Sequence, residues 1–133
     1  MSQHIESVVL DSEGLSAWVA QDRKVLGLLK VFHEMGADLI ISANTIVEVS
    51  HSRVNMPRLQ WALSRIKVEA VTEQTAKEAA RLLKATGLHG HKYAIDATVA
   101  EAALRQPGPV VLLTSDIDDM ARLCGKRIGL IGI

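Results

Sequence analysis

Disulfides, an excess of one charge and long apolar runs are all missing from the sequence, and each absence excludes a class of protein. The 133 residues contain one cysteine, Cys124, so no internal disulfide can form, which fits a reducing compartment and a packing role for the thiol. Lysine plus arginine and aspartate plus glutamate number 15 each, so no overall positive field indicates nucleic-acid binding, although a local basic patch can still guide it.

Membrane insertion and secretion are not expected either. No segment approaches the roughly 20 apolar residues that span a bilayer. The polar, acidic opening MSQHIES also lacks the basic start of a signal peptide. We therefore expect a cytoplasmic protein without membrane contact.

What the sequence does contain is a regular alternation of apolar runs and helical patterns. Hydrophobic residues make up 48% of the chain, and neither a repeat nor a Ser/Pro-rich linker indicates a second domain, so we expect one domain over residues 1–133. The alternation predicts an α/β fold with a parallel sheet. The expected strands are SVVLD, ADLIIS, VEAV, VVLLTS and RIGLIGI.

The segments between these runs predict helices, most of them with one buried apolar face. One helix is expected from about Asn44 to Arg53, Pro57 is placed to start another, and Thr72 or Thr75 to cap a third. The expected buried faces, in chain order, are Leu15, Trp18 and Val19; Val25, Leu28, Leu29 and Phe32; Leu59, Leu63 and Ile66; Ala76, Ala79, Ala80 and Leu83; and Ile117, Met120, Ala121 and Cys124.

Two aspartates end apolar runs at positions where a parallel sheet presents its carboxyl edge. Asp11 closes SVVLD, and Asp116 follows VVLLTS. Ligands bind at that edge in open parallel sheets, so the pair is a candidate site. The simpler alternative is that each aspartate only caps the helix that follows it.

Two further acids interrupt apolar helix faces. Asp96 shares its predicted face with Val99, Ala100 and Ala103, and an inward carboxylate is costly unless it is paired, protonated or bound to a metal. The alternative to a metal-binding role for Asp96 is a buried ion pair with Arg or Lys. Glu48 lies within the apolar segment TIVEVS. One turn of helix can bring its side chain back toward the carboxyl edge of the sheet, and the alternative is that it points outward on a half-buried helix.

Together the four carboxylates predict a cation site. Like charges from two strand ends and two helix starts require a cation where they converge, and oxygen ligands favour Mg²⁺ or Mn²⁺ over Zn²⁺. Phosphoryl transfer is the chemistry that such ions most directly support.

Four segments, in order along the chain, have a familiar arrangement: VVLDSEGLSAW, ISANTIVEVSHSR, HGHKYAIDATVAEAA and LLTSDIDDMARL. On these segments the chain resembles PIN domains, and more closely the VapC-type toxins of bacterial toxin–antitoxin modules. The resemblance implies a five-stranded parallel sheet of order 3-2-1-4-5 with helices on both faces, Mg²⁺- or Mn²⁺-dependent endoribonuclease activity, a homodimer, and an antitoxin that silences the enzyme. We expect the antitoxin to insert a basic side chain among the acids.

The resemblance also assigns roles by position. Asp11, Glu48, Asp96 and Asp116 match the acidic quartet of the family, as metal ligands and catalytic residues, and Asp119 is expected to assist them. Ser12 or Thr114 is expected to orient a ligand. The chain departs from the family at Glu13 and Gly14; we expect Glu13 to point outward as a first-turn acid and Gly14 to give the backbone freedom.

Other polar and aromatic residues have both a functional and a structural interpretation. His89, His91 and Lys92 are expected to form a basic loop for an RNA phosphate or a solvated turn, and His51 and Arg53 to line the entrance or the surface. Trp18 and Trp61 are expected to pack in the core or an interface.

An interface between two copies of the chain is expected around Trp61, Leu63 and the stretch Ala79–Arg81. As a whole, the alternatives to a ribonuclease are a catalytically silent PIN-like module that binds RNA or protein and, fitting less well, a phosphohydrolase or receiver-type domain.

Overall fold

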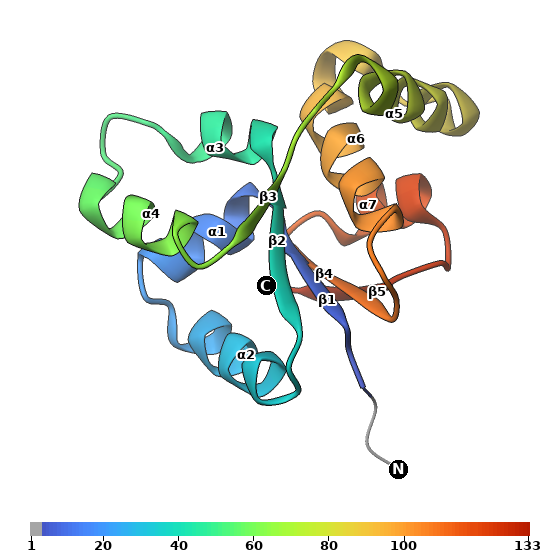
Figure 1. Cartoon of the computed structure of the whole chain (residues 1–133). Helices are drawn as coiled ribbons and strands as arrows, with labels where there is room; N and C mark the ends of the chain where they lie inside the picture. Colours follow the sequence, from blue (N-terminus) through green and yellow to red (C-terminus); the bar gives the residue numbers. More distant parts are fainter. Residues whose placement is uncertain (1–3) are drawn as a thin grey trace.

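The structure is a computed structural model that describes residues 4–133. All pairings in its five-stranded sheet are parallel, and the strand order is β3-β2-β1-β4-β5 (Figure 1). This confirms the α/β fold and the order expected from the sequence. The strands are β1 (Ser7–Leu10), β2 (Asp38–Ser42), β3 (Lys67–Glu69), β4 (Val110–Thr114) and β5 (Gly129–Gly132).

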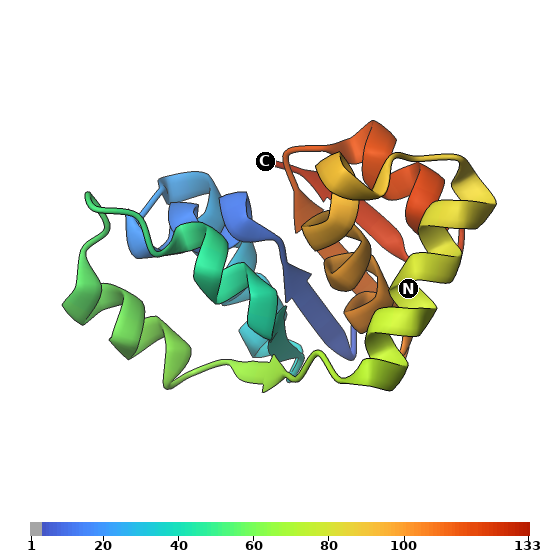
Figure 2. The ribbon, with the colours of Figure 1, turned by 90° about the horizontal axis from the view of Figure 1, so that it is seen from above.

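Helices cover both faces of this sheet. Helices α1 to α4 lie on one side, and α5 to α7 lie on the other (Figure 2). The helices are α1 (Ser12–Val19), α2 (Arg23–Glu34), α3 (Ala43–Val49), α4 (Met56–Leu63), α5 (Glu73–Thr86), α6 (Gly90–Leu104) and α7 (Ile117–Cys124). None of the helices within residues 4–133 has the length and apolar character needed to cross a membrane.

The strands point alternate side chains into two separate cores. Val8 and Leu10 pack among α1 to α4, whereas Val9 packs with Ala97 and Ala100 of α6 on the opposite face. Burial on both faces explains why the central strands read as continuous apolar runs. Cys124 is buried in the second core, where burial raises the pKa of its thiol to about 11, in agreement with the packing role.

Several predicted helix details are wrong. Helix α3 ends at Val49 instead of Arg53, because the backbone of Ser50 leaves the helical region, with φ −85° and ψ 59°. The Ile46 carbonyl accepts both the Ser50 N–H at 3.2 Å and the Ser50 hydroxyl at 2.6 Å. Helix α4 buries Leu59 and Ala62, while Leu63 is only half-buried and the buried Ile66 follows the helix.

The apolar faces of α5 and α7 are also rotated relative to the predicted faces. In α5, Ala79 is buried but Ala76 and Ala80 are exposed. In α7, Leu123 is buried and Ala121 is exposed. Alanine removes little apolar area from water on burial, so larger neighbours decide which face a helix turns inward.

Candidate active site

The carboxyl edge of the sheet holds a cavity of about 230 Å³ into which the predicted acids converge. Four of the five line it: Asp11 after β1, Glu48 in α3, Asp96 in α6 and Asp116 after β4. Asp119 in the first turn of α7 does not line the cavity, but its negative charge contributes to the electrostatic environment of Asp96. Residues distant in sequence are therefore brought to one place by the parallel topology.

Asp11 is both a helix cap and a member of this group. Its Oδ1 accepts the backbone N–H of Gly14 at 2.8 Å, and its Oδ2 accepts that of Ser115 at 3.3 Å. The side chain is buried, and burial raises the pKa of its carboxyl, while hydrogen bonds from Thr114, Gly14 and Ser115 act in the opposite direction. These bonds fix the carboxylate between the ends of β1 and β4.

Asp116 does not act as a cap, so the capping alternative is wrong for this residue. It occupies the N-cap position of α7, yet its side chain accepts no hydrogen bond from the helix. Its backbone N–H instead donates to the Thr114 hydroxyl at 2.9 Å. The exposed carboxylate is consequently available to the cavity.

Asp96 has the most perturbed environment of the group. Its predicted neighbours Val99, Ala100 and Ala103 are buried, and Asp96 itself is half-buried in α6. Burial raises the pKa of its carboxyl to about 6, helped by the negative charges of Asp116, Glu48, Asp11 and Asp119. No Lys or Arg pairs with it within residues 4–133, so the ion-pair alternative finds no partner there.

Glu48 is exposed, and its helix α3 is joined to α6, the helix of Asp96, by a polar contact. Asn44 Nδ2, one turn earlier in α3, lies 3.4 Å from Thr98 Oγ1 in α6, and Thr98 Oγ1 donates to the Ile95 carbonyl at 2.7 Å. The sequence analysis missed Asn44 and Thr98. Their small polar side chains within apolar helices were the available signal.

The chemistry of these donors fits a hard divalent cation, because the cavity offers carboxylate oxygens and no thiolate. Within the described residues, however, no three Asp, Glu, His or Cys side chains lie close enough to hold an ion as they stand. Four like charges repel one another, so a cation would have to draw the carboxylates together.

The basic residues near the cavity belong to a helix and not to a loop. Helix α6 begins at Gly90, with the His89 Nδ1 accepting the backbone N–H of His91 at 3.2 Å, so His91 and Lys92 line the cavity from the first helical turn. Glu13 is exposed as expected and lines the cavity as well. Basic and acidic side chains therefore line the same cavity.

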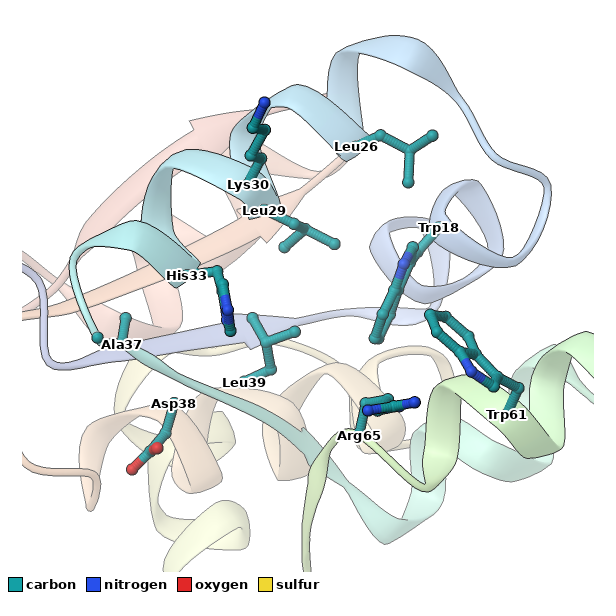
Figure 3. A pocket seen from close by; sticks show the side chains of 11 residues that line it. Trp18, Leu26, Leu29, Lys30, His33, Ala37, Asp38, Leu39, Trp61 and Arg65 are labelled. Atoms are coloured by element: carbon teal, nitrogen blue, oxygen red, sulfur yellow. The ribbon is translucent and has the colours of Figure 1, made fainter.

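The two tryptophans lie together away from this cavity. Trp18 is buried, Trp61 is 52% exposed, and their ring centroids are 5.7 Å apart in an edge-to-face arrangement. Figure 3 shows them beside a larger cavity of about 680 Å³ between α1, α2, β2 and α4, with Lys30 and Arg65 among its lining. Core packing is thus confirmed for Trp18, whereas Trp61 presents an open face.

Comparisons with known proteins agree with this architecture. A solved structure of VapBC2 from Rickettsia felis, bound to a DNA fragment from its promoter, contains a chain similar to this one with a TM-score of 0.72. The two chains are 16% identical, and the alignment covers 96% of this chain and 98% of the other. No curated protein sequence matches the chain.

The family assignment comes from the sequence itself. The model of the PIN domain matches residues 8–126, a range that includes all five strand-edge and helix carboxylates described above. With the 3-2-1-4-5 sheet and the acidic cavity at its carboxyl edge, this match shows that the chain belongs to the PIN domain family.

Proposed function

We propose that this PIN domain is an Mg²⁺- or Mn²⁺-dependent endoribonuclease and the toxin of a toxin–antitoxin pair. The observation that carries the proposal is the convergence of Asp11, Glu48, Asp96 and Asp116 on one cavity without a pairing Lys or Arg within residues 4–133. A silent module would be free to lose such acids, because uncompensated carboxylates destabilise the fold.

The quartet would hold the metal, and each member has a distinct setting for that task. Asp11 is fixed by two backbone N–H groups, whereas Asp116 and Glu48 are exposed and able to adjust. Asp96 has a raised pKa, so metal binding must displace its proton below about pH 6. When bound, Mg²⁺ or Mn²⁺ supplies Lewis acidity that activates water and stabilises charge on a phosphodiester.

Other residues of the cavity have supporting roles in this proposal. His91 and Lys92 line the same cavity from the first turn of α6, where they can receive an RNA phosphate. Thr114 orients the neighbouring carboxylates, since its hydroxyl accepts the Asp116 N–H and its side chain hydrogen-bonds Asp11. Ser12 also lines the cavity, and Asp119 adds negative charge beside it.

The partner in this proposal is an antitoxin protein that covers the site and silences it. The likeness to a chain of the Rickettsia felis VapBC2 structure supports it, and so does the cavity of Figure 3 beside the first helices. The antitoxin would place a basic side chain among the carboxylates. The proposal also includes a homodimer and a cytoplasmic location, in keeping with a buried, free Cys124.

The deciding experiment is cleavage of RNA by the purified chain with Mg²⁺ or Mn²⁺, compared with Asp96→Asn. The variant keeps the volume of the side chain but removes a negative oxygen, so we expect cleavage to fall by at least about 100-fold and the metal-induced rise in melting temperature to shrink.

Asp118→Asn is the matched control. Asp118 is exposed in the first turn of α7 and does not line the cavity, so this variant should cleave RNA and respond to metal like the wild type. Undiminished cleavage by Asp96→Asn would indicate a contaminating nuclease. A wild type inert on every RNA would favour the silent-module alternative.

A further inference from the structure

A third cavity, of about 430 Å³, has basic lining residues, in contrast to the acidic cavity that holds Asp11 and Asp96; we call it the basic cavity. It lies between α1 and the connection from α3 to α4, and His51, Arg53 and Arg58 line it together with Ser16 and Asn55. None of its described lining residues is an aspartate or glutamate. In a chain with zero formal net charge, this concentration of positive charge is local.

The backbone around this basic cavity is fixed, while its guanidinium groups are free. The Arg53 N–H donates to His51 Nδ1 and the Arg58 N–H donates to Asn55 Oδ1, both at 3.1 Å. Within residues 4–133 neither guanidinium forms an ion pair or a side-chain hydrogen bond. Helix α4, with no acid in its first turn, adds the positive end of its dipole.

The basic cavity adjoins the acidic one along two helices. On α1, Ser12 lines the acidic cavity and Ser16, one turn later, lines the basic cavity. On α3, the consecutive residues Glu48 and Val49 line the acidic and basic cavities respectively. The lining residues on α1 are thus separated by one helical turn, about 5.4 Å along the helix axis, and each nucleotide of a stacked strand advances about 3.4 Å.

We infer that the basic cavity is a subsite for a backbone phosphate of single-stranded RNA, a few nucleotides from the bond placed in the acidic cavity. The inference rests on the proposed ribonuclease function. An acidic centre repels the phosphates on either side of the bond to be cut, so neighbouring cations must offset that repulsion. Arg53 and Arg58 supply them as paired, planar donors suited to phosphate oxygens.

The test measures binding separately from cleavage. The binding constant K of a short fluorescein-labelled oligouridylate is measured in EDTA over a range of salt concentrations. Two proteins are compared: the Asp96→Asn variant, and the same variant that also carries Arg53→Gln and Arg58→Gln. The slope of log K against log salt is negative, and each lost phosphate contact on a single strand reduces its magnitude by about 0.7. Because Arg53 and Arg58 are proposed to share one phosphate, the double change should reduce the magnitude by about 0.7. With metal and an intact Asp96, the same pair should raise KM about fivefold or more and leave kcat unchanged.

The matched control is Lys126→Gln with Arg127→Gln, which removes two exposed charges between α7 and β5, away from both cavities. Arg53→Lys with Arg58→Lys should retain most of the salt dependence. The subsite is rejected if Arg53→Gln with Arg58→Gln leaves the salt slope unchanged, or if the control pair reduces the slope by the same amount. The basic cavity would then be a site for an acidic protein segment. A slope of reduced magnitude in a chain that cuts no RNA would retain the subsite and reject the nuclease.

Discussion

Asp96 shows how one residue can be unfavourable for the fold and suited to the site. It is half-buried on an apolar face and surrounded by the charges of Asp116, Glu48, Asp11 and Asp119, which together with burial raise its pKa from 3.8 to about 6. A bound divalent cation would reverse this cost, because positive charge favours the ionised carboxylate. Stability and metal affinity are therefore coupled at this one position.

The coupling predicts a pH dependence of stability in EDTA. Between about pH 4 and 6 the native Asp96 holds a proton that the unfolded chain has released, so its contribution to the free energy of unfolding falls as pH rises through this window. At neutral pH we expect Asp96→Asn to be more stable than the wild type by about 1 to 2 kcal/mol, allowing for solvent screening.

Urea unfolding near pH 5 and near pH 7 measures this effect, and the advantage of Asp96→Asn should be larger at the higher pH. Asp118→Asn, an exposed carboxylate outside the cavity, should follow the wild type. An advantage that is absent, or that grows on acidification, would contradict the assigned environment of Asp96.

The sequence predicted which acids line one cavity, but not how each one is held. Strand ends and helix periodicity are local patterns, and they sufficed to place Asp11, Glu48, Asp96 and Asp116 at one edge. Whether Asp116 capped α7 depended on a competing hydrogen bond, since its own N–H turns to the Thr114 hydroxyl. Such choices are made by tertiary contacts, which composition and spacing do not report.

At the scale of elements, α1 approaches the sheet very closely at Gly14. A Cβ atom there would lie 3.3 Å from the Leu113 carbonyl oxygen and 3.4 Å from Leu10 Cβ. Gly14 has no positive φ angle, so the expected role in backbone freedom is wrong, and its role is to let α1 pack against β1 and β4. The same glycine donates to Asp11, which links the packing to the site.

Gly14→Ala should therefore destabilise the protein by about 1 to 3 kcal/mol, because the crowded atoms belong partly to the backbone. Gly27→Ala in α2 is the control: a Cβ there meets nothing within 4 Å, so a gain of about 0.5 to 1 kcal/mol is expected. Thermal unfolding of both variants decides the matter. Equal effects of the two substitutions would mean that α1 does not need the close approach.

Element order was easier to predict than element faces. The central strands are buried on both sides, so their apolar runs were unambiguous, and the parallel sheet followed from the helical segments between them. Faces made largely of alanine, as in α5, leave the rotation of a helix weakly specified. The end of α3 lies at Ser50, whose backbone turns out of the helical region in a way that the residue types did not indicate.

For the whole molecule, exposed apolar side chains are distributed unevenly. The described large hydrophobic residues with more than a third of their surface exposed all fall within residues 26–68: Leu26, Val31, Val47, Met56, Trp61 and Val68. Trp61 lies on α4, on the opposite side of the sheet from the α5 stretch Ala79–Arg81 (Figure 2). The expected interface around both stretches would therefore have to extend around the β3 edge, where Val68 is exposed, and its α5 part is small or polar.

This distribution leads to a prediction about assembly. Large aromatic residues contribute more to protein interfaces than most others, and Trp61 has 52% of its surface exposed while its ring is held by Trp18 and Arg65. We expect multi-angle light scattering to give the mass of a dimer at micromolar concentrations, and Trp61→Ala to shift the dimer toward monomer. Val31→Ala, which shortens an exposed valine on α2, should remain dimeric.

A wild type that is monomeric at every concentration would reject self-association. A Trp61→Ala variant that stays fully dimeric would mean that the Trp61 ring does not contribute to the dimer and is free to bind an antitoxin at the cavity of Figure 3.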